Sequence, residues 1–419
     1  MKNKVLMIFV NSMLENVIPV SISILSSCLK NAGFEVKLFD TTFYKWGDIS
    51  ATENRIKYLQ IRDCKIEYNK NDVYSDLNNL LNEYCPDIIG VSTVECTFEF
   101  AVNLLNSMKT YKLQTNAHIS VGGIHTILAP ETLENIPLID SISIGEGEKN
   151  FIELCRRIKE SKNYYDVSGF WFRKKDESII KNPVKELINL DELPFLDFDI
   201  YESKRFMRPM MGKLYSTVIA EFTRGCPYNC SYCGDTALKN KFKNYGNWFR
   251  QKKMSKIEAE LQYYIKKYDA QYLYIMSESF LNMSVKFFDE FIEMYSKIKI
   301  PFWFNTRPES ITENKIKQLK EINCHRISLG IEHGNEFFRK KILKRNVSNE
   351  KIIEACKILE KFNISYSVNF ILGFPDETRE LAFNSIELCR KIQPDGISVH
   401  IFNPYRGTYL RNYSVEKGY

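Results

Sequence analysis

Three cysteines that fall within eight residues are the feature of this sequence most suited to chemistry. Cys226, Cys230 and Cys233 are spaced CxxxCxxC in the segment Thr-Arg-Gly-Cys-Pro-Tyr-Asn-Cys-Ser-Tyr-Cys-Gly. The glycines and the proline let such a loop wrap tightly around a ligand. Three thiolates suit a 4Fe–4S cluster, and the fourth iron of that cluster is then left without a protein ligand. The spacing therefore predicts a cluster whose open iron can take a small molecule.

A structural zinc site is the alternative for the same three cysteines. Zinc in such sites takes four ligands, commonly from two paired CxxC or HxxxH units. The sequence offers no second pair, and Cys324 with His325 is the nearest candidate. A cluster needs no fourth protein ligand, because an amine and a carboxylate of one small molecule can chelate the open iron. S-adenosylmethionine (SAM) carries both groups, so we interpret the cysteines as ligands of a cluster that cleaves SAM reductively.

Composition indicates a reducing compartment for these thiols. The chain carries eleven cysteines in 419 residues, opens without a signal peptide and contains no apolar run of about 18 residues. We therefore expect a cytoplasmic protein with no membrane span, in which most of the other cysteines fill core positions. A net charge of +6 argues against nucleic acid as a partner. The basic stretches Lys239–Lys243 and Arg339–Arg345 are expected to carry solvated charges on helices.

Strand and helix patterns alternate along residues 1–185. Continuous apolar runs, which are typical of buried parallel strands, alternate with segments of helical periodicity. This alternation predicts a doubly wound parallel α/β sheet of the flavodoxin or Rossmann type. A hairpin is expected at 170–181, and the polar stretch at 50–70 is interpreted as an insertion. The expected strands are Val5–Val10, Glu35–Phe39, Ile88–Val94, His118–Gly122 and Ser141–Ile144, and the expected helices are Ser21–Asn31, Asp72–Tyr84, Phe98–Thr110 and Asn150–Lys159.

The second half of the chain repeats a strand–helix unit six times. Regular repetition with right-handed crossovers curls a sheet into a barrel, and six units are too few to close the eight-stranded version. We therefore expect an open, TIM-like partial (β/α)6 barrel over 205–419, joined to the first domain by a linker at 186–204. The cysteine loop directly follows the first barrel strand, at the edge where such folds place chemistry. The expected strands are Thr217–Phe222, Tyr272–Met276, Phe302–Thr306, Arg326–Gly330, Ser365–Leu372 and Ile397–Phe402, and the expected helices are Ser255–Tyr268, Lys286–Lys297, Glu313–Ile322, Asn349–Phe362 and Thr378–Ile392.

Together these features resemble the cobalamin-binding radical SAM family, in which a flavodoxin-like corrinoid domain precedes a partial radical SAM barrel. The resemblance covers essentially the whole chain. It implies a 4Fe–4S cluster, SAM and cobalamin as cofactors, with a flavodoxin or ferredoxin-type protein as electron donor. It also implies that Cys226, Cys230 and Cys233 are both the metal ligands and the catalytic residues. Cobalamin rests on the resemblance alone, since the DxHxxG motif that ligates cobalt in some corrinoid proteins is absent.

In the barrel half, the resemblance implies further residues around SAM. Tyr232 would pack over the cluster or SAM, and Ser277 with Glu278 stands where relatives carry a polar stretch near the methionine amino group. Glu332 closes a Gly-Ile-Glu motif and would accept hydrogen bonds from the ribose hydroxyls or the amino group of SAM. Arg307 could meet the SAM carboxylate. Two further positions correspond to those that relatives place around the adenine, namely Asn369 and Gly373.

In the first half, short polar and glycine-rich loops follow three of the expected strands. Glycines at such places let the backbone approach a large flat ligand, at the edge where doubly wound sheets bind ligands. The motifs GGxH and GEGE resemble those of the family closely. We expect His125 to order its own loop or to contact the corrin side chains. The positions implied to bind cobalamin are Ser92, Thr93, Gly122, Gly123, His125, Gly145, Glu146 and Gly147.

The resemblance implies a radical enzyme with a small-molecule substrate. Cleavage of SAM would give a 5′-deoxyadenosyl radical that takes hydrogen from an unactivated carbon, and methylcobalamin would then deliver a methyl group to that carbon. A cobalamin-dependent radical cyclase or rearrangement enzyme is a second possibility. A corrinoid-binding sensor or carrier with an inactive barrel belongs to another class, and the intact cysteine loop argues against it.

Overall fold

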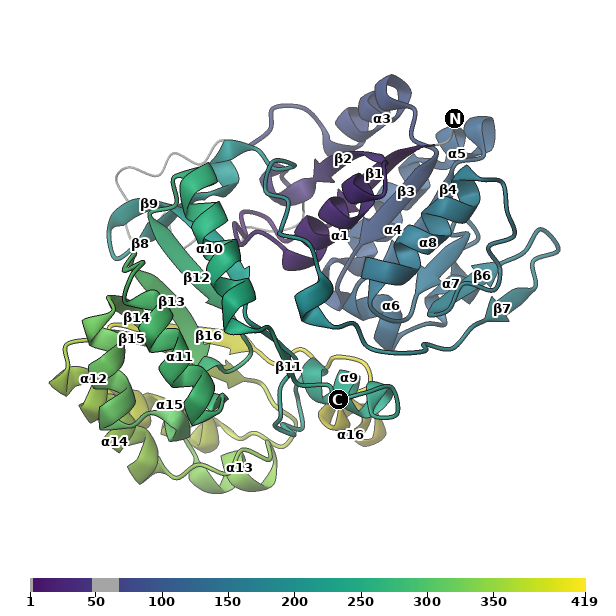
Figure 1. Cartoon of the computed structure of the whole chain (residues 1–419). Helices are drawn as coiled ribbons and strands as arrows, with labels where there is room; N and C mark the ends of the chain where they lie inside the picture. The colour runs from purple at the N-terminus through teal and green to yellow at the C-terminus, as the bar shows by residue number, and fades with distance from the viewer. Residues whose placement is uncertain (1–2, 47–67) are drawn as a thin grey trace. The chain divides into compact units, whose positions relative to one another are not determined.

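The computed structural model describes residues 3–46 and 68–419, which form two compact units (Figure 1). The first unit ends at Tyr215 and the second begins at Ser216. The insertion expected at 50–70 lies almost wholly outside the described residues. Completely buried apolar side chains occur in both units, so each has a hydrophobic core of its own.

The first unit is a doubly wound α/β sheet with strand order β2-β1-β3-β4-β5-β6-β7. The first five strands run parallel, and Val5, Leu6 and Ile8 of β1 are completely buried. The strand order reverses direction between β1 and β3, which is where sheets of this kind bind ligands at their carboxyl edge. The parallel strands are β1 (Lys4–Phe9), β2 (Glu35–Asp40), β3 (Ile88–Ser92), β4 (His118–Gly122) and β5 (Ser141–Ser143).

Helices cover both faces of this sheet, as the buried strands require. α1 packs beside α8, and α3, α4 and α5 pack together as a second group (Figure 1). Asp72 begins α3 by accepting a hydrogen bond from the Ser75 backbone nitrogen at 2.9 Å. The helices are α1 (Val20–Asn31), α3 (Val73–Tyr84), α4 (Phe98–Ser107), α5 (Lys109–Thr115), α6 (Ile124–Leu128), α7 (Thr132–Asn135) and α8 (Gly147–Lys159).

The hairpin expected at 170–181 forms and extends the sheet at the β5 edge. β6 (Phe170–Arg173) pairs antiparallel with β5, and β7 (Ile179–Lys181) pairs antiparallel with β6. Phe170 and Phe172 are completely buried and alternate with half-buried neighbours. The sequence predicts the hairpin but not its place, because strand pairing with β5 depends on residues far away along the chain.

The segment 186–204, expected as a linker, packs along α1 within the first unit. Asp197 accepts a hydrogen bond from Ser26 Oγ at 2.6 Å, and the Tyr201 hydroxyl lies 3.1 Å from Ser23 Oγ. Both serines are completely buried on α1. Their polar groups are therefore satisfied by this segment, and the bounds of the linker stay a prediction.

The second unit is an open partial barrel with strand order β16-β15-β14-β13-β12-β9-β8. The strands from β9 to β16 run parallel, and outer helices cover the apolar face to which Phe302 and Phe304 contribute (Figure 1). The β13 side chains that alternate with these two phenylalanines lie on the other face of the sheet. There, Trp303 Nε1 donates a hydrogen bond to Ser328 Oγ at 2.9 Å. These strands are β8 (Met207–Met210), β9 (Lys213–Glu221), β12 (Tyr272–Met276), β13 (Phe302–Thr306), β14 (Cys324–Glu332), β15 (Ser365–Leu372) and β16 (Gly396–Ile401).

The predicted fold class is confirmed, and the structure adds elements that the sequence pattern did not predict. In the first unit these are α6 and α7, and in the second they are β8, a short ribbon of β10 (Thr223–Arg224) and β11 (Arg250–Gln251), and the helices α9, α13 and α16. Among the described residues, no helix is long and apolar enough to cross a membrane. The helices of this unit are α9 (Gly234–Phe242), α10 (Met254–Tyr268), α11 (Val285–Tyr295), α12 (Glu313–Glu321), α13 (Glu336–Lys341), α14 (Asn349–Lys361), α15 (Arg379–Ile392) and α16 (Tyr409–Lys417).

Truncation of Phe304 tests the outer core of the barrel. This side chain is completely buried, and the centre of its ring lies 4.7 Å from the centre of the Phe280 ring. Phe304→Ala leaves a cavity that close packing cannot refill, so we expect the free energy of unfolding to fall by about 3–5 kcal/mol. Phe337→Ala is the control, because Phe337 is 71% exposed. Equal denaturation midpoints for the two variants would contradict this account of the core.

Candidate active site

The cysteine loop leaves the barrel between two short strands that pair with each other. β10 pairs antiparallel with β11, so the chain from 225 to 249 forms one closed excursion between them. β10 follows β9 almost directly, which places the start of the excursion at the carboxyl edge of the barrel sheet. The ribbon therefore fixes both ends of the segment that carries all three cysteines.

Cys230 lies deepest of the three cysteines. It is buried, whereas Cys226 and Cys233 are half-buried. Two guanidinium groups approach its sulfur, since Arg307 Nη1 lies 3.6 Å and Arg345 Nη1 lies 3.7 Å from Cys230 Sγ. Positive charge at this distance stabilises a thiolate and the negative charge of a thiolate-bound cluster. The donor set and its surroundings therefore fit an iron–sulfur cluster.

The backbone before the first cysteine passes too close to Trp248 for a side chain. Gly225 has φ +84°, and a Cβ at this residue would lie 2.5 Å from the Trp248 carbonyl oxygen. The Trp248 Nε1 donates to Asp235 Oδ1 at 3.0 Å, in the first turn of α9. Cys233 is the N-cap residue of the same helix, so the positive end of the helix dipole also favours a thiolate there.

Ser231 fastens the cysteine loop to distant parts of the barrel. Its hydroxyl donates to the Ile342 carbonyl at 2.6 Å, and its backbone nitrogen donates to the Leu343 carbonyl at 3.1 Å. Its own carbonyl accepts from the Leu410 nitrogen at 3.1 Å. Tyr232, next in the chain, packs against the apolar cluster that contains Leu343 and Leu410. The segment after α13 and the start of α16 thus both brace the loop.

Burial keeps the thiols of Cys226 and Cys233 protonated in the metal-free protein. It raises the pKa of Cys226 to about 11 and that of Cys233 to about 12, so binding of iron must release protons. Cys324 and His325 begin β14, at the sheet edge opposite the cysteine loop, and cannot complete a zinc site there. Within residues 3–46 and 68–419, no three side chains of Cys, His, Asp or Glu converge as ligands of a single metal ion.

Glu332 ends β14 on a bulge that turns its carboxylate back over the strand. Its φ is +73°, and the pairing register between β14 and β15 shifts there. A Cβ at Gly330 would lie 2.6 Å from Glu332 Oε1, so the glycine makes room for the returning side chain. Arg345 Nη1 lies 3.8 Å from the same oxygen. Burial raises the pKa of the Glu332 carboxyl, and the charge of Arg345 opposes that rise.

Arg345 is the site residue that sequence reasoning missed. The pattern predicts solvated charges for Arg339–Arg345, and this prediction is wrong for both arginines, because Arg339 is completely buried and Arg345 is 4% exposed. Arg339 donates from Nη2 to the Val347 carbonyl at 2.9 Å and holds the turn after α13. That turn directs Arg345 to Cys230, to the Tyr232 hydroxyl and to Glu332. A basic run gives no signal of burial, since the contacts lie far away in sequence.

Ser277 and Glu278 follow β12 beside the start of the cysteine excursion. Ser277 Oγ lies 2.6 Å from Thr223 Oγ1, and Ser277 is buried. Glu278 is exposed to solvent, although many protein atoms surround its carboxyl. The surrounding protein, and after it the charges of Asp235 and Glu221, raise the pKa of the Glu278 carboxyl to about 7. Its charge therefore changes near neutral pH.

Arg307 is tied to the cysteine loop as well as to its own turn. Its guanidinium carbon lies 3.6 Å from the centre of the Tyr228 ring, and its Nε donates to Glu309 Oε1 at 2.6 Å. The residue is buried. Tyr228 lies between the first two cysteines in sequence, so Arg307, which follows β13, and Arg345, which follows α13, reach the same loop from two different elements. Contact of Arg307 with the SAM carboxylate stays a prediction.

Gly373 begins the loop after β15, and a carboxylate holds that loop in place. Glu377 accepts hydrogen bonds from the backbone nitrogens of Gly373 and the next residue, and from His333 Nε2 at 3.1 Å. His333 is completely buried and follows β14 directly, so this pair joins the ends of β14 and β15. Asn369 lies on β15, in register with the Gly-Ile-Glu motif of β14. The predicted adenine and ribose positions are therefore neighbours.

In the first unit, three strand ends meet at one edge. The Val10 nitrogen after β1 donates to the Ser92 carbonyl, and the Thr93 nitrogen donates to the Gly122 carbonyl, both at 3.1 Å. Gly123 has φ +104°, and a Cβ there would lie 2.3 Å from the Thr93 carbonyl oxygen. Gly123 therefore lets the loop after β4 pack closely against the loop after β3, at the carboxyl edge where doubly wound sheets bind ligands such as a corrin.

His125 points into the first unit. It is 4% exposed, its ring stacks on Phe98 with centroids 3.8 Å apart, and its Nε2 lies 3.1 Å from Thr132 Oγ1. These contacts fix the loop between β4 and α7. The imidazole is therefore engaged by side chains of its own domain at both its face and one of its nitrogens.

The loop after β5 is held by the chain that follows the β6–β7 hairpin. A Cβ at Gly145 would lie 2.9 Å from Val184 Cγ2, and Glu146 Oε2 accepts from the Ile188 nitrogen at 2.8 Å. Gly147 then begins α8. The shape of this loop therefore depends on the chain that follows the hairpin.

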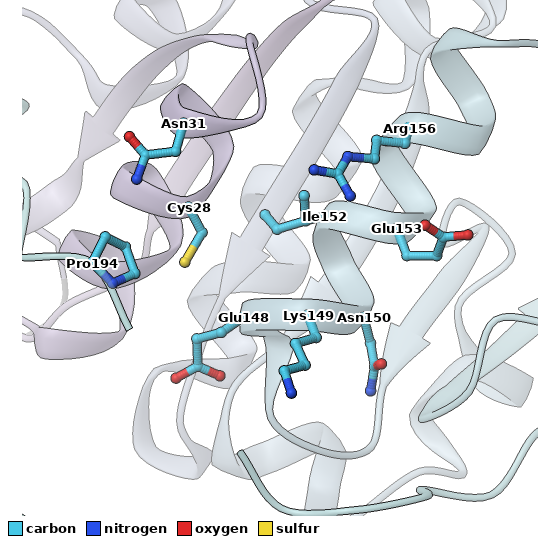
Figure 2. A pocket seen from close by; sticks show the side chains of 9 residues that line it. All are labelled: Cys28, Asn31, Glu148, Lys149, Asn150, Ile152, Glu153, Arg156 and Pro194. Carbon is cyan, nitrogen blue, oxygen red and sulfur yellow. The ribbon is translucent and has the colours of Figure 1, made fainter. Parts of the chain in front are cut away.

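A cavity of about 450 Å³ lies between α1 and α8, away from these strand ends (Figure 2). Figure 2 shows side chains from both helices around it, together with Pro194. None of the predicted cobalamin positions is among its described lining residues. The lining consists of Cys28, Asn31, Glu148, Lys149, Asn150, Ile152, Glu153, Arg156 and Pro194.

Comparison with known proteins assigns both units. The chain matches the radical SAM superfamily over residues 220–389 and the B12 binding domain over residues 7–155. It is 26% identical over 345 residues to an uncharacterised methyltransferase of Pyrococcus horikoshii, covering 82% of this chain and 72% of that protein. It is 25% identical over 329 residues to the anaerobic magnesium-protoporphyrin IX monomethyl ester cyclase of Rubrivivax gelatinosus. This match covers 76% of this chain and 57% of the cyclase.

Solved structures agree with this assignment at the level of the fold. TsrM, a radical SAM methyltransferase from Kitasatospora setae with cobalamin and a 4Fe–4S cluster bound, matches with a TM-score of 0.73 and 15% identity. The match covers all of this chain and 78% of TsrM. A corrinoid domain followed by a radical SAM domain is thus the class that the fold and the site define.

The chain carries a B12 binding domain and a radical SAM domain, as its resemblance to the cobalamin-binding radical SAM family predicted. The prediction that it is a radical SAM enzyme is confirmed, and so are its three predicted cofactors, a 4Fe–4S cluster, SAM and cobalamin. The chain spans 57% of the length of the cyclase that it resembles.

Gly225→Ala tests the close passage of the loop beside Trp248. The added Cβ would lie 2.5 Å from a backbone oxygen, so we expect the loop to shift and the iron content after anaerobic reconstitution to fall below half of the wild-type value. Gly212→Ala is the matched control, because Gly212 has φ +79° but nothing within 4 Å of its Cβ position. Equal iron loss in both variants would mean that backbone strain alone, and not the contact with Trp248, disturbs the site.

Arg345→Gln tests the charge beside Cys230. A cation stabilises the reduced cluster, which carries one more negative charge, so its removal lowers the midpoint potential. At an effective dielectric constant of about 20 the expected shift is on the order of 100 mV, measured by a redox titration followed by EPR. Arg345→Lys keeps the charge and should shift the potential much less. An unchanged potential in Arg345→Gln would show that the guanidinium acts on packing only.

Proposed function

We propose that this protein is a cobalamin-dependent radical SAM methyltransferase that methylates an unactivated carbon of a small molecule. The observation that carries the proposal is the cysteine loop at the carboxyl edge of the partial barrel, with two guanidinium groups beside its buried thiol. The B12 binding domain on the same chain and the similarity to a protein named as a methyltransferase support methyl transfer.

The cysteine loop would hold the cluster. Cys226, Cys230 and Cys233 supply three thiolates, and a 4Fe–4S cluster bound to them supplies the electron that breaks the sulfonium bond of SAM. The Tyr232 ring, packed on the apolar cluster around Leu343, keeps water from the buried side of the loop. The arginines keep the thiols in a positive environment, which favours loss of their protons when iron binds.

The strand ends beside the loop would orient SAM. Glu332, folded back over Gly330, offers its carboxylate to the ribose hydroxyls or the amino group, and Arg345 holds that carboxylate in place. Glu278 would accept from the amino group, and Arg307 would bind the carboxylate. Backbone groups of the loop that begins at Gly373 would meet the adenine, because Glu377 fixes the shape of that loop.

The loops at the edge of the first unit would bind cobalamin, which supplies the methyl group and regains it from a second SAM. Their small residues give the backbone access to the corrin. An electron is needed for each cleavage of SAM, and a flavodoxin or ferredoxin-type protein would deliver it. The free cysteines of the described residues support a reducing compartment such as the cytoplasm as the location of the enzyme.

Product analysis tests the proposal. Protein reconstituted anaerobically with iron, sulfide and cobalamin should release 5′-deoxyadenosine from SAM in the presence of dithionite and a viologen. It should also form S-adenosylhomocysteine, which reports transfer of a methyl group from SAM. Deoxyadenosine without S-adenosylhomocysteine would favour a radical cyclase, the function of one similar protein. Absence of both products, with the cluster seen by EPR, would contradict the proposal.

The pKa of Glu278 predicts how SAM binding depends on pH. Because this pKa is raised to about 7, the carboxyl is charged above neutral pH and becomes protonated as the pH falls through 7. Its attraction for the cationic amino group is then lost, so the affinity for SAM should fall between pH 8 and pH 6. Glu278→Gln removes the carboxylate at every pH, so its affinity relative to wild type should be lowest at pH 8. A constant ratio, measured by equilibrium dialysis, would show that Glu278 does not contact SAM.

A further inference from the structure

The excursion that carries the cysteines continues into an unusually basic segment. Residues 236–257 contain seven lysines and arginines and no aspartate or glutamate. The whole chain has 52 acidic residues in 419, so a stretch of this length would ordinarily hold two or three. The segment comprises α9, the turn after it, β11 and the start of α10.

Four of these cations gather around α9, and we name Lys239, Lys241, Lys243 and Arg250 the basic surface. Lys241 and Lys243 are exposed, and Lys239 and Arg250 are partly exposed. Folding brings Arg250 to the lysines, because its guanidinium lies over the Trp248 ring at 5.8 Å and that ring stacks on Phe242 of α9 at 5.4 Å. The positive charge is therefore concentrated in space as well as in sequence.

The basic surface begins at the cysteine loop itself. Lys239 Nζ donates to the carbonyls of Pro227 and Tyr228, both at 2.8 Å, and these residues lie between the first two cysteines. Cys226 and Cys233 are the two half-buried cysteines, so the loop is least covered where it meets α9. Asp235, the nearest carboxylate in sequence, accepts a hydrogen bond from Trp248 Nε1 and also interacts with the charge of Lys239.

We propose that the basic surface is the docking site of an acidic one-electron carrier protein. This rests on the proposed function, in which one electron must reach the cysteine loop from outside, so that the carrier is oxidised by one electron as the site is reduced by one. Charge complementarity steers weak, fast association of the kind that redox partners use. The position favours a carrier over a nucleic acid, because the charges surround an electron entry point rather than line a long groove.

Charge reversal tests this surface through binding. The probes are an acidic flavodoxin and an acidic ferredoxin, titrated into the reconstituted holoenzyme. We expect the affinity of the K241E/K243E variant for at least one carrier to fall tenfold or more at low ionic strength, and the difference to shrink at about 0.5 M salt. The matched control is K297E/K299E, which has the same spacing and charge change in exposed residues just before β13, at the opposite edge of the sheet. It should bind as wild type does.

Turnover gives a second readout. We expect the ratio of carrier-driven to dithionite-driven formation of deoxyadenosine to fall in K241E/K243E, because dithionite needs no docking surface. The milder K241Q/K243Q variant should show a smaller loss and guards against misfolding of the reversed variant. Circular dichroism and iron content check that each variant is intact.

Three results would overturn the docking proposal. One is equal carrier affinity in wild type and both lysine variants, and another is the absence of salt-dependent binding of either carrier to wild type. The third is loss of binding to a short RNA or DNA duplex in K241E/K243E with no change toward the carriers, which would assign the surface to nucleic acid. Failure of wild type to cleave SAM with dithionite would instead contradict the proposed function, and the binding titration would still decide the surface.

Discussion

Two buried guanidinium groups beside the Cys230 thiol are the constraint on which the rest of the site depends. A buried cation is tolerable only if anionic or strongly polar groups surround it. A protonated thiol meets that need poorly, whereas a thiolate that shares its charge with iron meets it well. Arg345 finds its remaining partners in the Gly330 carbonyl and Glu332, so the cysteine loop, the end of β14 and the turn after α13 are held together by one side chain.

The partial barrel serves this arrangement because parallel strands bring their carboxyl ends to one edge. Glu278, Arg307, Glu332 and the Gly373 loop come from four successive strands, and each is fixed by local means. A β-bulge directs the Glu332 side chain, the Glu377 carboxylate accepts a hydrogen bond from the Gly373 nitrogen, and the Tyr228 ring packs against the Arg307 guanidinium. Parallel strands also bring their carboxyl ends to one edge in the first unit, where backbone hydrogen bonds join the ends of β1, β3 and β4.

The sequence predicted the elements that depend on residues close to one another along the chain. Apolar runs such as Val5–Val10 indicate buried strands, and the CxxxCxxC spacing without a second ligand pair favours an iron–sulfur cluster over zinc. β8 and the ribbon of β10 and β11 could not be predicted, because two to four residues carry no periodicity. Arg345 could not be distinguished from the solvated charges around it, since its partners lie as far as 115 residues away. Ser231 was missed for the same reason.

The ribbon of β10 and β11 encloses one stretch of chain that would serve two functions. The first part would bind the cluster, and the second would dock the electron carrier. Both ends of the excursion are pinned to the barrel, and Ser231 anchors its middle independently of α9. The exposed lysines of this stretch, Lys241 and Lys243, can therefore be exchanged while Asp235 and Lys239, which bond Trp248 and the metal-binding turn, are kept. An engineer could match the enzyme to the electron carriers of a new host by rewriting such exposed positions alone.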